Sequence, residues 1–527
     1  MLALLLTLPA SAAEDDFEFA LDGYYRVRAH HFNGLYTPDD PDDDLAAPWP
    51  REPGTGRYMQ HRLRLAPSVN FDGGRAEFHM MADAFDDAVW GDNEQLASTS
   101  LFAGAPSSTG LDGQPVPNFE VKRAWAKFQT PVGLITVGRQ PSNWGMGLLA
   151  NDGDGFDDTF GENHYGNTFD RFVFATKPLA ISETLAGVGN GDMPLFFAVG
   201  FDRLVEDPLT QYYGYKCDPE DPDDDIHCAE DDDHSYTEER ETTYRPNNWW
   251  TEHDDDVWEM LYVLIYKGED VDIGGTPSDL TLGAYAVNRR QGETTSNVWI
   301  IDAYARMVRK NVYLEAEGLT IQGKSNAIVL PGSIDESLPN PLYKEPNIWG
   351  GVARGGYTSG PQDAWLEVGY ASGDDNVGDE SFTGRPINPD FNVGLLLYEE
   401  VLSRVSQEVW TEGAEGLWTN GGVYNSYYVF PQVRRTLLPG WNLHGAFLVA
   451  FPHRPDGSII VSDENGATSP ILGWEADAAL KIDFQSHMRF SLEGGYGKVT
   501  DRIPWQNQGL TLDGRVWTVQ SRIAYEF

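Results

Sequence analysis

Apolar and polar residues alternate with a period of two along most of this chain. The last segment, 517–527, places its apolar residues on one parity: Trp517, Val519, Ile523, Tyr525 and Phe527. Arg522 and Glu526 fall on the other parity. Successive side chains of a strand point to opposite faces, so the pattern predicts β-strands with one apolar and one polar face.

The connections between these segments alternate in length. Short joints occur at 72–75, 130–133, 309–311, 438–441 and 484–487. Long, polar joints lie near 35–56, 91–117, 150–168, 207–253, 325–347 and 375–425. This alternation predicts an all-β fold, a closed antiparallel transmembrane β-barrel of about 18 strands with short periplasmic turns and long acidic extracellular loops. Propeller blades also give many strands, but they do not give this alternation of turns.

A closed barrel leaves no unpaired backbone edge in the hydrocarbon, so the apolar parity is expected to face lipid. The terminal aromatic residue, with apolar residues at alternate positions before it, resembles the signal by which the barrel-assembly machinery recognises outer-membrane barrels. Phe527, Tyr525 and Ile523 would carry that signal. The expected location is therefore the outer membrane of a Gram-negative bacterium.

The first residues indicate export. Residues 1–13 join an apolar run to small residues, as at the end of a secretory signal peptide, and 14–527 are expected to form a single barrel. No basic residue precedes the apolar run, which leaves open whether the leader is truncated. The alternative is a buried N-terminal strand.

Net charge narrows the range of partners. With 82 acidic against 37 basic residues, the net charge is −45, which argues against a nucleic-acid partner. The acidic residues collect in the long joints, as expected of solvated loops. They form either a solvated rim or weak calcium sites, for which the candidates are Asp152, Asp154, Asp157, Asp223 and Asp225. The spacing does not match an EF-hand, and no other cofactor is expected.

Cys217 and Cys228, the two cysteines, lie in the most acidic joint. A loop disulfide is the favoured interpretation for an exported protein. A metal site is the alternative, because His227 and His234 are close in sequence, but few ligands are present.

Barrel closure makes the last strands neighbours of the first, and this gathers basic residues on one wall of the lumen. The predicted basic wall consists of Arg26, Arg28, Arg62, Arg64, Arg489 and Arg522. The roughly opposite strands direct acidic residues inward: Asp302, Glu315, Glu317 and Glu367. Such walls would set up a transverse field that orients dipolar solutes. The alternative is that each arginine pairs with a neighbouring acid such as Asp22, Glu493 or Glu526.

One long joint departs from the strand pattern. Residues 391–413 have helical spacing. This helix either folds into the mouth as a constriction or lies on the rim.

No Ser, His and acid set falls together on one wall, so we expect no enzymatic activity, and an outer-membrane hydrolase is a remote alternative. The leading prediction is a channel for the passive passage of hydrophilic solutes. A plugged barrel that acts as a surface-binding or adhesive protein is the alternative.

The stretch 121–178 contains "GRQ" (138–140), "WGMGLL" (144–149), a "DG" loop and "FDR" (169–171), and "EVGYASGDD" follows at 367–375. These features resemble outer-membrane barrels of the alginate-export type, and still more a group of uncharacterised outer-membrane barrels of myxobacteria and their relatives. The resemblance implies an eighteen-stranded porin-like pore, polysaccharide export with a periplasmic partner, and Arg139 and Arg171 as lumen or constriction residues. The acidic loops favour a neutral or mixed-charge polysaccharide, or small hydrophilic solutes, over an anionic polymer.

Overall fold

The computed structural model describes most of the chain. The described residues are 17–35, 55–90, 119–156, 160–163, 166–186, 193–206, 257–292, 295–326, 328, 343–406, 419–457, 459–484, 487–504, 506–507, 510–511 and 514–527. The predicted signal peptide, 1–13, lies outside this part of the chain.

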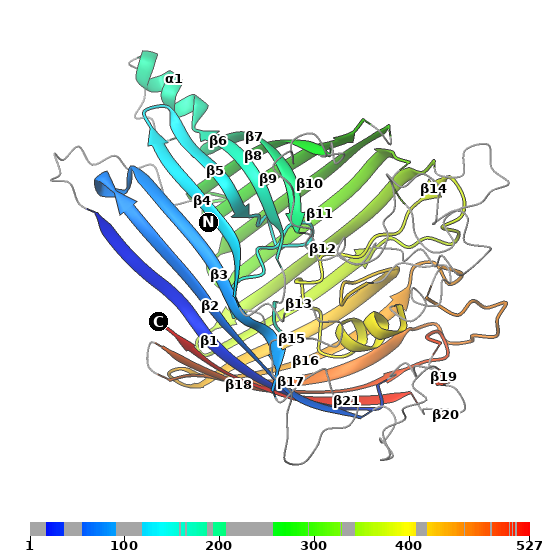
Figure 1. Ribbon diagram of the computed structural model, residues 1–527. Helices are drawn as coiled ribbons and strands as arrows, with labels where there is room; N and C mark the ends of the chain where they lie inside the picture. The colour runs from blue at the N-terminus through cyan, green and yellow to red at the C-terminus, as the bar shows by residue number, and fades with distance from the viewer. Residues whose placement is uncertain are drawn as a thin grey trace.

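Within the described residues, eighteen strands form one antiparallel barrel (Figure 1). They are β1 (Glu18–Asn33), β2 (Gly56–Phe71), β3 (Ala76–Val89), β4 (Glu120–Thr130), β5 (Gly133–Pro141), β6 (Thr168–Thr176), β7 (Leu195–Glu206), β8 (Trp258–Asp272), β9 (Pro277–Gln291), β10 (Ser296–Arg309), β11 (Val312–Lys324), β12 (Glu345–Ser359), β13 (Gln362–Ala371), β15 (Ser426–Leu438), β16 (Trp441–Pro452), β17 (Gly473–Phe484), β18 (Met488–Val499) and β21 (Arg515–Glu526). Each pairs with its neighbour in the chain, as expected of a meander.

The barrel closes between its first and last strands. Strand β1 pairs with β21 in a register that sets Tyr25 opposite Tyr525 and Arg28 opposite Arg522. Further hydrogen bonds join Gly23 to the terminal Phe527 in both directions. The predicted fold class, a closed barrel of about 18 strands, is confirmed. The short strand β14 (Ser381–Phe382) is added to it, in parallel with β12. Strands β19 (Gln506–Asn507) and β20 (Leu510–Thr511) form a separate two-stranded sheet.

Connections at one end of the barrel are short, except for the joint 177–194 between β6 and β7, and those at the other end are mostly long. Strands β10 and β11 are separated only by residues 310–311, whereas 142–167 separate β5 from β6 and 372–425 separate β13 from β15. The short-turn end also carries a 3-10 turn, η1 (Asp72–Gly74), and the helix α1 (Pro178–Ala186), which the sequence pattern did not predict. Figure 1 shows α1 projecting from the barrel wall.

The two faces of the wall differ in chemistry. Large apolar side chains on the outward parity are exposed on all sides of the barrel, and examples are Phe172, Tyr262, Ile301, Leu366, Val433, Leu492 and Ile523. The inward parity of the same strands carries the charged residues described below. Because a closed barrel satisfies its backbone hydrogen bonds internally, its apolar outside can lie in hydrocarbon.

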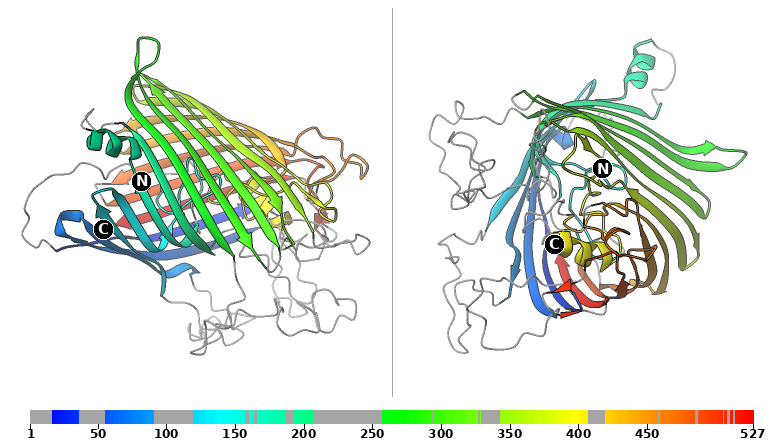
Figure 2. Two further views of the ribbon diagram at one scale, coloured as in Figure 1. Left: turned by 90° about the horizontal axis from the view of Figure 1, so that it is seen from above. Right: turned by 90° about the vertical axis from the view of Figure 1, so that its right-hand side faces the viewer.

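At the long-loop end, parts of two long connections fold into the interior of the barrel. Figure 2 shows, in the view along the barrel, parts of 142–167 and 372–425 inside the ring of strands. Buried apolar residues of these segments, among them Leu148, Phe160, Leu396 and Tyr398, pack together with inward residues of the wall. Among the described residues, no helix is long and apolar enough to cross a membrane.

Candidate functional site

A basic wall lines the lumen where the barrel closes. Arg26 on β1 lies directly opposite Arg62 on β2, and Arg28 lies directly opposite Arg522 on β21. All four side chains are buried. Like charges directly opposite each other destabilise a sheet, so acidic groups must lie close to this wall.

The inward segment 142–167 supplies such a group. One Glu162 carboxylate oxygen lies 2.6 Å from Arg26 Nη1 and 3.4 Å from Arg522 Nη1. The other oxygen lies 3.1 Å from Arg28 Nη1. Since both Glu162 and the arginines are buried, these ion pairs are little screened by solvent. Glu162 therefore fixes the inward segment to the basic wall.

The remaining arginines of the predicted wall are also in the lumen and also paired. Arg64 forms a bidentate ion pair with Asp83 at 2.8 Å and approaches Asp154 of the inward segment at 3.2 Å. Arg489, nearer the short-turn end, lies 2.5 Å from Glu526. Sequence analysis gave as an alternative to an open basic wall that each arginine pairs with a neighbouring acid, and Arg489 is paired in this way with Glu526.

The opposite wall holds the other side of the same segment. Trp144 Nε1 donates to Asp302 Oδ1 at 2.8 Å, and the backbone N–H of Leu148 donates to Glu317 Oε1 at 3.2 Å. The N–H of Met146 also donates to Glu317. Asp302 and Glu317 lie on β10 and β11, opposite the closure of the barrel. The described parts of the segment 142–167 thus contact the acidic wall through Trp144 and Leu148 and the basic wall through Glu162.

A second inward segment, which belongs to the connection 372–425 between β13 and β15, is hydrogen-bonded to the first. The backbone N–H of Asn388 donates to the Leu148 carbonyl at 2.9 Å, and its side chain donates to Asn167 Oδ1 at 2.7 Å. Asp390 accepts from the N–H of Gly166 at 2.7 Å. Gly166 has a φ of +77°, and an added Cβ would lie 2.1 Å from the Asp152 carbonyl oxygen, so this position requires glycine. The two segments form one crossing structure.

The predicted helix of 391–413 begins inside the barrel. Its described part contains the π-helix η3 (Leu397–Leu402), preceded by Leu395 and Leu396. The carboxylate of Glu475 on β17 accepts the backbone N–H groups of Leu395, Leu396 and Leu397 at 2.6–3.0 Å. These N–H groups have no partner within the helix, so a carboxylate satisfies them well. Of the two expected positions, the structure shows the one inside the mouth, and 407–413 lie outside the described residues.

Replacing Glu475 with alanine should loosen η3 without unfolding the barrel. Each buried N–H group left without an acceptor costs about 1–3 kcal/mol, so amide exchange over 391–406 should accelerate by roughly tenfold or more. Hydrogen exchange measured by mass spectrometry checks this. The control is Asp483→Asn on the same strand, which lies near the short turns and holds no part of η3. Unchanged exchange in Glu475→Ala would show that this carboxylate does not hold the segment.

His453, which directly follows β16, is hydrogen-bonded to the start of the connection 372–425. The backbone N–H of Gly373 donates to His453 Nδ1 at 3.2 Å, and the ring packs against Tyr370 and Tyr427. Burial lowers the pKa of His453 below its ordinary value of 6.5, and the charge of Arg454 lowers the pKa further, against an opposing effect of Asp375. The neutral ring is therefore the form that the fold favours.

We expect the contact between Gly373 and His453 to weaken on acidification. Because the pKa of His453 is lower in the folded protein, the neutral ring stabilises the fold fully above pH 6.5, and this stability is lost as the pH falls toward the folded-state pKa. In addition, a protonated Nδ1 can no longer accept a hydrogen bond. After correction for intrinsic exchange rates, amide protection of 372–376 should fall between about pH 7.5 and about pH 5.5. In His453→Gln the protection should no longer depend on pH over this range. An equal fall in both proteins would refute the role of the histidine.

Further inward residues form rows of charges across neighbouring strands. Arg171 on β6, Asp202 on β7, Glu259 on β8 and Arg289 on β9 are direct cross-strand partners in succession. Arg171 Nη2 lies 2.5 Å from Asp202, and Arg289 Nε lies 2.5 Å from Glu259. The expected lumen position of Arg171 agrees with this placement. Such rows stiffen the wall and keep the lumen face polar.

Two predicted acidic residues belong to a similar row. Arg354 on β12 lies directly between Glu315 on β11 and Glu367 on β13. Its distances are 3.9 Å to Glu315 and 2.6 Å to Glu367, and Glu367 also accepts from the Tyr428 hydroxyl at 2.7 Å. The acidic wall is therefore divided: Asp302 and Glu317 hold the inward segment, whereas Glu315 and Glu367 are paired within the wall.

Arg139 does not lie in the lumen, contrary to the expectation drawn from the resemblance. It shares the parity of the exposed Val137, and it forms a bidentate pair with Asp170 at 2.9 Å. Asp170 shares the parity of the exposed Phe172. Both residues are therefore on the outer surface, because directly paired residues of neighbouring strands lie on one face of the sheet.

The predicted calcium ligands are only partly described. Asp152 accepts from Asn143 and from the Asp154 N–H, and Asp154 approaches Arg64. Among the described residues, no group of three or more His, Cys, Asp or Glu side chains is arranged to hold a metal. Asp157, Asp223, Asp225 and the cysteines Cys217 and Cys228 lie outside the described part of the chain.

Sequence analysis missed the residues that hold the crossing structure. Glu162, Trp144, Asn388 and Asp390 lie in joints, where no periodicity indicates direction. Glu475 gave a usable signal, because it is an acidic residue on the inward parity of a predicted strand, beside Asp477. The residues of the predicted assembly signal, Ile523, Tyr525 and Phe527, are exposed on the outward parity.

Comparison with known proteins gives similarity in structure only. OccK2 (OpdF) of Pseudomonas aeruginosa, in complex with glucuronate, is similar at 11% identity and a TM-score of 0.47, with 97% of this chain and 96% of that chain covered. A BenF-like porin from Pseudomonas fluorescens is similar at 10% identity and a TM-score of 0.45, with 96% of this chain and 98% of that chain covered. The outer membrane protein OpdK of P. aeruginosa is similar at 10% identity and a TM-score of 0.47, with 96% of this chain and 98% of that chain covered. No protein-family model and no curated protein matches the chain.

Proposed function

We propose that this protein is an outer-membrane channel through which hydrophilic solutes pass without energy coupling. The observation that carries the proposal is the contrast between the two faces of one closed barrel. Apolar side chains cover its outside, and charged rows such as Arg171–Asp202–Glu259–Arg289 line its inside. An apolar band outside and a polar lumen inside are the properties of a water-filled transmembrane barrel.

The crossing structure supports a selective passage rather than a wide pore. It narrows the lumen at the long-loop end and lies directly against the basic wall through Glu162. The arginines of this wall are themselves covered by the inward segment, so a passing solute is exposed to their positive potential rather than to direct contact. Small hydrophilic solutes that are dipolar or negatively charged are attracted by such a potential.

Conductance in planar lipid bilayers tests the proposal. The purified protein should give stepwise single-channel currents that persist over time. A protein that inserts into the bilayer, as shown by protection from added protease, and yet carries no current would refute passive transport.

A plugged barrel is the second candidate, and one observation favours it. The interior at the mouth contains a cluster of buried apolar side chains that includes Leu148, Leu396 and Tyr398. A tightly packed cluster of this kind excludes water, and loops held on a closed barrel would suit ligand binding at the cell surface. Insertion without conductance is the result that favours this candidate.

Polysaccharide export, with a periplasmic partner at the short turns, is the finer proposal implied by the resemblance of 121–178. It requires the crossing structure to move aside for a polymer chain. The anchors at both walls, Glu162 on the basic side and Trp144 on the acidic side, oppose such movement. Passage of small solutes therefore agrees better with the contacts observed. Assembly by the barrel-assembly machinery through Phe527, Tyr525 and Ile523 remains a proposal of the same kind.

A further inference from the structure

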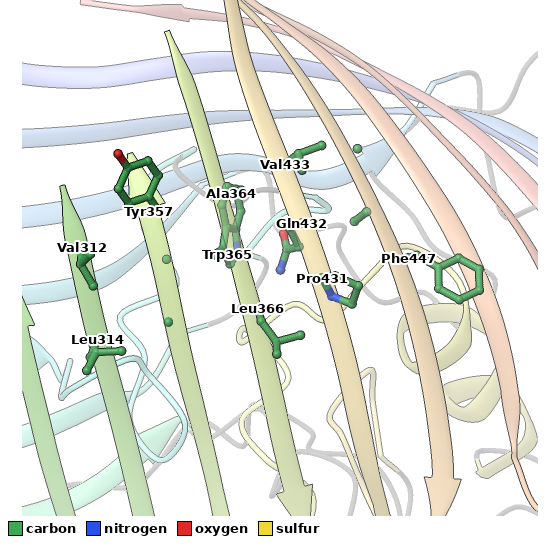
Figure 3. Close-up of a pocket in the computed structure, with 14 residues that line it drawn as sticks. Val312, Leu314, Tyr357, Ala364, Trp365, Leu366, Pro431, Gln432, Val433 and Phe447 are labelled. Carbon is green, nitrogen blue, oxygen red and sulfur yellow. The ribbon is translucent and has the colours of Figure 1, made fainter. Parts of the chain in front are cut away.

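An apolar groove lies on the outward face of β11, β12, β13, β15 and β16 (Figure 3). Its volume is about 740 Å3. The small residues Gly355, Ala364 and Gly445 form its floor. Exposed side chains surround them: Leu314, Tyr357, Leu366 and Phe447. Figure 3 shows Tyr357 and Phe447 on strands at opposite sides of the groove.

The groove exists because side chains are missing from its floor. At Gly445, an added Cβ would lie 3.7 Å from Val433 Cγ2, which is ordinary contact. The backbone there is not in a conformation that requires glycine, since no positive φ is recorded at Gly355 or Gly445. A larger residue at 445 would therefore fit the strand and occupy the groove.

A row of polar residues borders the groove on the side of the short turns. Within the groove, Tyr357, Ala364 and Val433 are direct cross-strand partners. A second set of direct cross-strand partners lies two residues nearer the turns on the same three strands. It consists of Ser359, Gln362 and Arg435, which also face outward. Two residues of an antiparallel strand span about 7 Å, so this row lies one side-chain length below the groove.

Arg435 is available for a ligand at this border. Its neighbour Arg434, on the inward parity, forms an ion pair with Asp363, whereas no ion pair of Arg435 occurs among the described residues. A guanidinium binds a phosphate through two parallel N–H donors, and the neighbouring Ser359 hydroxyl and Gln362 amide add further donors. The outward face thus combines an apolar groove with a phosphate-binding row.

The short-turn end indicates which leaflet contains this row. Short turns of outer-membrane barrels face the periplasm, so the row lies at the headgroup level of the inner leaflet, which faces the periplasm. A phospholipid there would place an acyl chain along the wall and its phosphodiester beside Arg435. A second copy fits less well, because a two-fold contact would set the groove against itself and leave a void between the copies.

We propose that the groove and the row Ser359–Gln362–Arg435 bind one phospholipid of the periplasmic leaflet. One acyl chain fills the groove over Gly355, Ala364 and Gly445, and the phosphodiester accepts hydrogen bonds from Arg435. The proposal rests on the membrane insertion that the proposed function assumes. It does not depend on whether the lumen conducts.

Native mass spectrometry of the whole protein in detergent micelles tests the site. With phosphatidylglycerol added, the wild type should retain one lipid. Gly445→Leu, which fills the groove, and Arg435→Gln, which removes the guanidinium, should each lower that occupancy by roughly fivefold or more. Diacylglycerol of the same chain length, which lacks the phosphodiester, should not be retained.

Two variants serve as matched controls. Gly494→Leu places the same side chain on the outward face of β18, where Gly494 shares the parity of the exposed Leu492. Arg139→Gln removes an outward arginine near the long-loop end of β5. Both should retain lipid as the wild type does. Equal occupancy in all five proteins would overturn the proposal, as would a wild-type oligomer without lipid that Gly445→Leu dissociates.

Bilayer recordings on the same preparations separate this proposal from the proposed function. Retained lipid in a protein without conductance would contradict only the channel. Conductance in a protein whose lipid occupancy is the same in the wild type and Gly445→Leu would contradict only the lipid site.

Discussion

Replacing Glu162 with glutamine is expected to shift the channel toward anions. The carboxylate faces Arg26, Arg28 and Arg522, and glutamine has a similar shape without the charge. Because these groups are buried, the added positive potential is poorly screened, and the anion-to-cation permeability ratio should rise by roughly threefold or more. The reversal potential across a potassium chloride gradient measures this ratio.

Asp170→Asn is the matched control for this experiment. It removes one carboxylate from an arginine pair, but the Asp170–Arg139 pair lies on the outer surface. The reversal potential of this variant should equal that of the wild type. If Glu162→Gln also left the reversal potential unchanged, ions would not pass the basic wall where Glu162 lies.

Removing the second inward segment should produce the largest change in conductance. In a variant with 386–424 replaced by a short Gly/Ser linker, the lumen loses η3 and the contacts of Asn388 and Asp390 with the first segment. Single-channel conductance should rise by roughly fivefold, because the open cross-section limits ion flow. The planar-bilayer current gives the measurement.

Deletion of α1 provides the control for the loss of chain. This helix, Pro178–Ala186, lies at the short-turn end and projects from the barrel, so its removal should not alter conductance (Figure 1). A variant lacking 386–424 that folds and conducts like the wild type would show that the segment does not restrict the passage.

The strands could be predicted because a barrel wall imposes a strict period of two over its whole length. Trp517, Val519 and Ile523 must share a face once they lie on one strand. Closure then follows from the terminal alternation, and it brings Arg28 and Arg522 together even though they lie at opposite ends of the sequence. The basic wall was therefore accessible to sequence analysis.

That the basic wall holds an inward segment of the chain could not be predicted from the sequence. Glu162 reaches the arginines from a joint, and no periodic signal describes the path of a joint through space. For the same reason, Asp302 and Glu317 could be placed on an inward face, but their partners Trp144 and Leu148 could not. A transverse field between two open walls was a reasonable prediction, whereas the structure shows both walls holding one segment.

Arg139 illustrates a different limit. Its strand, 133–141, has apolar residues on both parities, so the pattern did not decide the face, and the expected position came from the resemblance alone. The parity of the exposed Val137 and Phe172 decides it in the structure. Helix α1 was missed because the joint after β6 is neither short nor markedly acidic.

The central claim is that one wall has lipid on its outside and water on its inside. Spin labels placed singly at 488–492 on β18, with Cys217 and Cys228 replaced by serine, test it in liposomes. Oxygen accessibility should be high at the outward Met488, Phe490 and Leu492, and accessibility to a polar nickel complex should be high at the inward Arg489, whose side chain is partly exposed in the lumen. Equal accessibility at both parities, or a protein that stays monodisperse in buffer without detergent, would contradict the account.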